Sequence, residues 1–145
     1  MIDLVDAVSK RLDEIFKGEY AIYLENVEQG LKVPCFFVHP IYGSDRNMLS
    51  NRKHMVQEFD IMFIPEEEGR RLAFVKVSDK LFDSFDFLKL EDGSILYTFD
   101  RRIDVTDDML HFRITFKFDY MKEVTEDQIM QDTLHNKVSV IDNGN

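Results

Sequence analysis

The strongest constraint on the fold of this chain is a stretch of strict alternation toward its C-terminal end. Between residues 110 and 120 every second side chain is large and apolar, and the positions between them are polar or charged. The apolar row is Leu110, Phe112, Ile114, Phe116, Phe118 and Tyr120. Because successive side chains of a strand point to opposite faces, this pattern predicts a β-strand with one buried face. A slip of one residue would expose the whole row, so the register is firmly specified.

Two amphipathic helices are predicted from apolar residues at helical spacing. The first runs from Val5 to Phe16 and ends at Lys17-Gly18. The second carries the apolar stripe Leu72, Val75, Leu81, Phe82 and Phe85, with Val77 off its centre. Further strands are predicted at 20–24, 33–41 and 54–64, near 101–105, and in a hairpin of 87–90 with 95–99.

This order of elements predicts an α+β domain. Short connections favour antiparallel pairing, so we expect an antiparallel or mixed sheet of about five to seven strands, packed by two helices on one face. Residues 1–121 form the predicted domain, a size that suits one hydrophobic core. Residues 122–145 are largely polar with scattered hydrophobes. Two interpretations of them stay open, a loose tail or an arm that orders on a neighbouring subunit.

A polar segment from Tyr42 to Lys53 separates two of the predicted strands. A tight hairpin usually needs about two to five connecting residues. We therefore expect a long loop that is either disordered or reaches a partner. Its charged and amide side chains are the candidate assembly contacts, namely Arg46, Asn47, Asn51, Arg52 and Lys53.

The net charge of −10 limits the classes of partner. A surface that grips phosphates needs clustered Lys and Arg, which so acidic a chain does not favour. The N-terminal segment carries charges throughout and lacks the basic and apolar regions of a signal peptide. No apolar run approaches the roughly 20 residues that span a bilayer. We expect no membrane contact, and synthesis in a reducing cytoplasm in line with the single cysteine.

Catalytic and metal-binding patterns are missing from the sequence. The four histidines are scattered, and neither a phosphate-binding nor a nucleophile motif occurs. One chemical alternative stays open, a small thiol-dependent enzyme that uses Cys35 with His39 on the same predicted strand. The other interpretation of Cys35 is a buried, reduced core thiol. We therefore predict binding or assembly in place of catalysis, with no cofactor and no metal.

Short motifs in the first half of the chain resemble those of a known family. They are Tyr23, the turn Val27-Glu28-Gln29-Gly30, the strand Pro34-Cys35-Phe36-Phe37, and Phe59-Asp60-Ile61 before Pro65. A first helix, a loop with Arg46 and Asn51-Arg52, and a late Phe-rich strand complete the layout. In these features residues 1–120 resemble the tail terminator family of tailed phages and of phage-tail-like particles of Gram-positive bacteria.

The resemblance implies a structural protein of the virion tail, made in the cytoplasm of the bacterial host, without catalytic residues. It implies a hexameric ring that sits on the last ring of the tail tube, stops tube growth and offers a docking surface to the neck or head. The implied partners are other copies of the chain, the tube protein, and neck, head-completion or sheath proteins. DNA would pass through the lumen without specific binding. A head–tail connector or neck protein of similar fold is the alternative.

Overall fold

The computed structural model describes residues 4–25 and 30–122. In chain order the elements are α1 (Leu4–Ile15), β1 (Ala21–Tyr23), β2 (Cys35–Asn47), β3 (Arg52–Ile64), α2 (Arg70–Ser84), β4 (Phe87–Lys89), β5 (Ile95–Thr106) and β6 (Met109–Met121). Neither described helix has the length and apolar character needed to cross a membrane.

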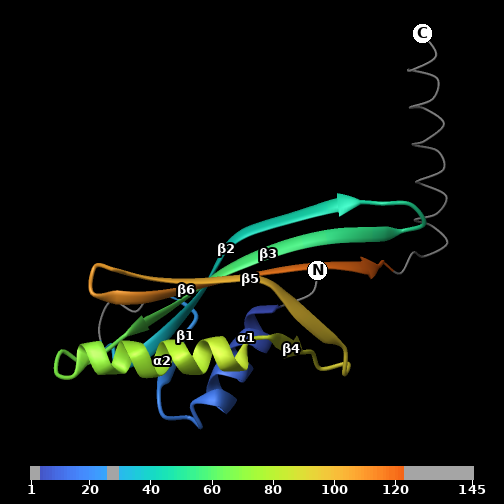
Figure 1. Cartoon of the computed structure of the whole chain (residues 1–145). Helices are drawn as coiled ribbons and strands as arrows, with labels where there is room; N and C mark the ends of the chain where they lie inside the picture. The colour runs from blue at the N-terminus through green and yellow to red at the C-terminus, as the bar shows by residue number, and fades with distance from the viewer. Residues whose placement is uncertain (1–3, 26–29, 123–145) are drawn as a thin grey trace.

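The strands form one six-stranded sheet in the order β1-β2-β3-β6-β5-β4. Neighbouring strands are antiparallel except for β1 and β2, which are parallel. Both helices lie on the same side of the sheet (Figure 1). The predicted α+β fold is therefore confirmed, with a mixed sheet of six strands and two helices in two layers.

The core lies between the helices and the inner face of the sheet, which is the face turned toward α1 and α2. On β6, Phe112, Ile114 and Phe116 are fully buried, as the alternation predicts. Rings from the region of α2 meet this row, with the centroid of Phe82 at 5.5 Å and that of Phe85 at 5.9 Å from that of Phe112. Burial of each such ring contributes about 1.5–3 kcal/mol, so this aromatic layer is a main source of stability.

The first helix follows its predicted pattern. α1 buries Leu4, Val8 and Leu12 on one side, four residues apart. Its end is closed by the amide of Gly18, which donates a hydrogen bond to the carbonyl oxygen of Asp13 over 3.1 Å. Gly18 has a φ of 71°, the left-handed conformation that commonly ends a helix.

The second helix meets the core with only part of its predicted stripe: Leu81 and Phe85 are fully buried as expected, but the first half of the stripe is not. Leu72 and Val75 belong to the predicted stripe, yet they are 59% and 53% exposed. Val77, expected off the stripe, is buried in the core together with Leu81. Apolar residues occur on more than one side of this helix, so spacing alone does not decide which side meets the sheet. The predicted stripe is wrong at these positions.

The predicted loop at 42–53 is also wrong, because most of it is strand. β2 continues past Pro40 to Asn47 by way of a bulge after Pro40. β3 already begins at Arg52, so that the connection consists of residues 48–51. These strand ends are polar on both faces, and the sequence therefore lacks the alternation by which a half-buried strand is recognised.

β5 joins two elements that the sequence predicts as separate strands. The second half of the predicted hairpin and the strand near 101–105 form one strand, with a bulge between Thr98 and Asp100. A tight turn follows it. Asp107 and Asp108 there have φ values of 53° and 60°, as a tight hairpin turn of type I′ requires.

Candidate assembly interface

The ends of β2, β3 and β6 project beyond the helices as a three-stranded arm (Figure 1). We define the arm as residues 44–56 and 117–122, and the remaining described residues as the body. In the arm the register brings Arg46 opposite His54, and His54 opposite Asp119. The tip is the turn at 48–51, where the amide of Lys122 donates to the carbonyl oxygen of Asn51 over 3.1 Å. The arm is thus held mainly by its backbone ladder.

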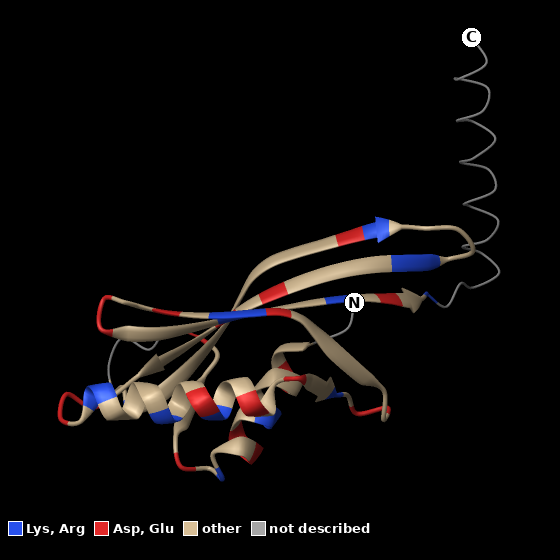
Figure 2. Cartoon of the chain, viewed as in Figure 1, with Lys and Arg blue, Asp and Glu red and all other residues tan. Residues whose placement is uncertain are grey.

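The arm carries the opposite charge to the rest of the chain. Its cations are Arg46, Arg52, Lys53, Lys117 and Lys122, and its acids are Asp45 and Asp119. Figure 2 shows the resulting concentration of basic residues on the ends of β2 and β3. The chain as a whole has a net charge of −10. A basic extension on an acidic protein is complementary to the acidic surface of another copy.

Local side-chain contacts already engage the two acids of the arm. Nζ of Lys53 lies 3.3 Å from Oδ2 of Asp45, and Nδ1 of His54 lies 2.6 Å from Oδ1 of Asp119. Arg46 and Arg52 have no ion-pair partner among the described residues. These two guanidinium groups are therefore available to a carboxylate of a partner, which Arg can hold through two hydrogen bonds.

The tip also exposes apolar side chains. Leu49, within the turn, is 90% exposed, and Met48 beside it is 41% exposed. Met121, at the end of β6, is 64% exposed. The tip thus places an exposed apolar residue close to Arg52 in the sequence, and Arg is among the residue types enriched at interface hot spots. Leu49 was not among the predicted contacts, and its only signal in the sequence is the isolated Met48-Leu49 pair within a polar segment.

The structure brings the predicted contact residues together. Arg46 and Asn47 end β2, Asn51 lies in the turn, and Arg52 and Lys53 begin β3. They therefore cluster at the arm tip, with all but Asn51 on strand ends and not on the expected loop. Their role in assembly stays a prediction.

The motif that carries the family resemblance lies at the other end of β2. Cys35, Phe36 and Phe37 begin this strand and are buried in the body, directly after Pro34. Gly30 has a φ of 79°, a conformation that favours glycine. Val27 and Gln29 lie outside the described residues. The described part of the motif therefore has a structural position, remote from the arm tip along the strand.

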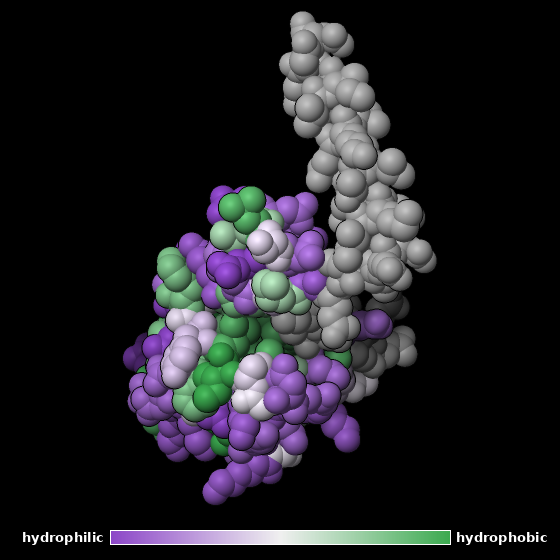
Figure 3. All heavy atoms as spheres, turned by 90° about the vertical axis from the view of Figure 1, so that its right-hand side faces the viewer, coloured by the Kyte–Doolittle hydropathy of each residue, from purple (hydrophilic) through white to green (hydrophobic). Residues whose placement is uncertain are grey.

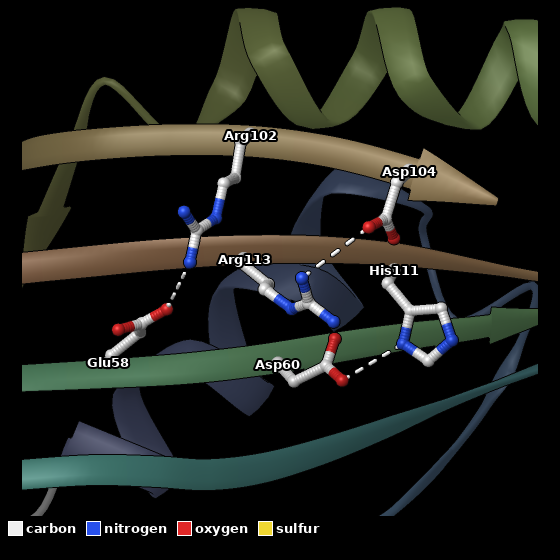
Figure 4. Close-up of polar contacts among 6 residues, drawn as sticks. All are labelled: Glu58, Asp60, Arg102, Asp104, His111 and Arg113. Carbon is white, nitrogen blue, oxygen red and sulfur yellow. Dashed lines mark hydrogen bonds and ion pairs between the residues drawn. The ribbon is translucent and has the colours of Figure 1, made fainter. Parts of the chain in front are cut away.

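Charged side chains also form a ladder on the outer face of the sheet, opposite the helices (Figure 4). Arg102 donates to Glu58 over 3.2 Å. Arg113 donates to Asp104 over 3.4 Å, and Figure 4 shows its guanidinium between Asp104 and Asp60. These contacts link β3, β6 and β5, as opposite charges on adjacent strands do. The ladder connects the strands of the body, and most of its charged groups are paired with one another.

Asp60 is the most enclosed acid of this ladder. It is 8% exposed, and its Oδ2 lies 2.9 Å from Nδ1 of His111. Its Oδ1 is buried and has no hydrogen-bond partner among the described residues. A buried acceptor without a donor costs about 1–3 kcal/mol. The nearby cation of Arg113 on the next strand offsets part of that cost.

The candidate thiol site does not have the geometry of a nucleophile and its base. Cys35 is fully buried, and this burial raises the pKa of its thiol above the ordinary value of 9.0. His39 is four residues away on the same strand, about 13 Å at 3.3 Å per residue. The ring of Phe37 lies between them along the strand, 5.8 Å from that of His39. Elsewhere among residues 4–25 and 30–122, no three His, Cys, Asp or Glu side chains group as a metal site.

Comparison with protein-family models gives a match over most of the chain. A family model described as "Phage tail terminator protein" matches residues 3–128. The match covers all helices and strands described above, and with them both the body and the arm. No curated protein matches the chain.

Proposed function

The chain belongs to the phage tail terminator family, and from this premise we propose that it forms a ring, six copies in number, which caps the tail tube. Membership of the family implies a structural role in the virion tail and association with other tail proteins. The proposal adds that the ring stops polymerisation of the tube. It also adds that the opposite side of the ring is the docking surface for the neck or head.

The observation that carries the proposal is the basic arm on an acidic chain. A ring needs heterologous contacts, in which one patch of a subunit meets a different patch of the next. The unpaired Arg46 and Arg52 and the exposed Leu49 form one such patch. Most acids of the chain lie outside the arm, and they can supply carboxylate partners on a neighbouring copy. Arg46, Asn47, Asn51, Arg52 and Lys53 are accordingly proposed as contacts to a neighbouring subunit or to the tube.

The charge balance also suits the passage of DNA. A lumen lined by acids would not bind phosphates, whose grip on proteins depends on Lys and Arg. The net charge of −10 supports such a lumen. The further partners in this proposal are the tube protein and the neck, head-completion or sheath proteins, with no membrane and no specific DNA contact.

Assembly with the tube protein of the same tail tests the proposal. Electron microscopy of tubes grown with the protein should show shorter tubes that end in sixfold rings. Native mass measurement of the free protein should show a species of six times the chain mass. A strict monomer that leaves tube length unchanged would contradict the proposal. Capture of the head-side adaptor protein in place of the tube protein would identify a head–tail connector instead.

A further inference from the structure

A groove lies beneath the junction of arm and body. It has a volume of about 690 Å³, within the range of about 300–1,000 Å³ that is typical of binding sites. Its walls come from the start of α1, from β2 around its bulge, and from the inner face of β3. The main apolar lining residues are Leu4, Pro40, Ile41, Tyr42, Met55 and Phe59. Figure 3 shows hydrophobic residues gathered in a hollow between two hydrophilic regions on this side of the molecule.

The rim of the groove exposes large apolar side chains. Ile41 is 49% exposed and Tyr42 is 55% exposed, whereas Met55 and Phe59 at the floor are almost fully buried. Asp45 is the only charged residue of the lining. Grouped exposed hydrophobes of this kind mark a surface that a partner covers.

The chain itself contains a segment that starts close to the groove. β6 ends at Met121 on the arm, and residues 123–145 follow. Met55 of the groove floor pairs with Phe118, which is three residues from Met121 and so about 10 Å away along the strand. The family match ends at residue 128, so residues 129–145 lie beyond it.

The composition of residues 123–145 complements both the groove and the arm. Met130, Leu134, Val138 and Ile141 recur at the spacing of one helix face. The segment has the acids Glu123, Glu126, Asp127, Asp132 and Asp142 against a single Lys137. An amphipathic helix laid into an apolar groove is a recurrent mode of recognition. Its acids would meet the cations of the arm, Arg46 and Arg52 among them.

We propose that the groove of each copy receives the apolar stripe of residues 123–145 from the neighbouring copy. This inference rests on the proposed ring, which supplies that neighbour. The direction of the chain favours the neighbour as donor, because β6 runs outward along the arm, away from the groove of its own copy. A return to that groove needs a sharp reversal, and residues 122–143 contain neither Gly nor Pro to mark one.

Disulfide trapping between two variants of the full chain tests the proposal. One carries Ile41→Cys and the other carries Leu134→Cys, and the native Cys35 stays buried in both. Mixed under mild oxidation, the two should yield a cross-linked dimer, in at least threefold excess over a mixture of Tyr97→Cys with Ile41→Cys. Tyr97, 69% exposed beside Phe87, represents the alternative that another surface of a second copy fills the groove.

The outcomes separate three cases. A mixed dimer with Leu134→Cys supports the proposal. An internal cross-link within the double variant Ile41→Cys/Leu134→Cys, without the mixed dimer, overturns it in favour of the groove of the same copy. Preferential cross-linking of Tyr97→Cys overturns it in favour of the second surface.

Native mass measurement of the same samples separates this inference from the proposed function. Rings without the mixed cross-link overturn only the inference about the groove, whereas a monomer at all concentrations overturns both. Ile41→Glu should lower the ring population at least threefold. Leu72→Glu is the matched control, because it places the same charge on a similarly exposed position of α2 and should leave the rings unchanged. Equal ring populations in the two variants would also overturn the inference.

Discussion

β3 passes through two environments, and the contrast between them separates stability from assembly. In the body, Phe59, Ile61 and Phe63 are 2%, 0% and 1% exposed beneath the helices. In the arm, Arg52 at the start of the same strand is exposed, beside the Leu49 side chain at 90% exposure. The backbone ladder to β2 and β6 continues through both regions. The two regions therefore differ in what their side chains do and not in how the backbone pairs.

The difference indicates that the body provides stability and the arm provides contacts with partners. Burial of apolar surface is the main favourable term in folding, and in this chain it is concentrated in the body. Side chains of the arm contribute little to that core and are available for contacts with partners, as residues on projecting segments of rigid scaffolds commonly are. Substitutions in the body should therefore alter stability, and substitutions at the tip should alter assembly.

The largest expected effect is on the stability of the body. Phe112→Ala removes a fully buried ring between β6 and α2 and should lower the free energy of unfolding by about 3–5 kcal/mol. Leu49→Ala at the arm tip should change it by less than about 0.5 kcal/mol. Urea unfolding of the two variants measures both. Similar losses would show that the arm and the body share one core.

Charge reversal at the tip should have the next largest effect, on assembly. Arg46→Glu with Arg52→Glu should raise the concentration needed for ring formation about tenfold or more, because juxtaposed like charges cost several kcal/mol. The matched control is Arg71→Glu with Lys76→Glu on the exposed side of α2, which makes the same change in net charge. Native mass measurement should show loss of rings only in the first variant. Unchanged rings in that variant would remove the arm tip from the interface.

The buried thiol should show a smaller effect, again on stability. Cys35→Ala should lower the free energy of unfolding by about 1–2 kcal/mol. It should abolish no enzymatic activity, because the thiol is not expected to act as a nucleophile. Because burial raises the pKa of the Cys35 thiol above 9.0, its stabilising contribution is complete below that pH and decreases as the pH rises above it. Urea unfolding between pH 7 and pH 10 measures this decline. Rapid labelling of Cys35 by iodoacetamide in the native protein at pH 7 would instead indicate an activated thiol.

Added salt should have the smallest effect on assembly, and it should weaken only the contacts made by the arm. Raising the ionic strength from 0.1 M to 1 M shortens the Debye length from about 10 Å to about 3 Å. Contacts made by Arg46 and Arg52 should weaken, so the ring population should decrease a few-fold. Thermal unfolding of the monomeric body should change little over the same range. A ring population that is independent of salt would favour apolar contacts such as Leu49 as the main determinant.

The same contrast explains what the sequence could predict. The strand, face and register of β6 follow from its alternation because one face is buried and the other is not. The strand ends at 44–47 and 52–53 have water on both faces, so their residues are polar without alternation and their sequence indicates a loop. Val77 was predicted to lie off the buried stripe because α2 has apolar residues on more than one of its sides. Several orientations of the helix therefore satisfy the pattern.

The candidate interface was predictable in part. The length and polarity of the segment 42–53 indicated Arg46, Arg52 and Lys53, and the structure gathers them at one tip. Their distance from the motif at Cys35–Phe37 could not be predicted, because it depends on the continuation of β2 through Pro40. The groove at Ile41 was equally hidden, since its walls come from three elements that only the fold brings together.

Imaging of the tube end tests the central claim most directly, namely that the arm tip is the contact by which this protein assembles into a ring. Cryo-electron microscopy of tail tubes capped by the full chain should show six copies in a closed ring. The residues around Leu49 and Arg52 of each copy should contact the next copy or the tube. A ring whose arm tips all lie free in solvent, or tubes that never acquire the protein, would contradict the account.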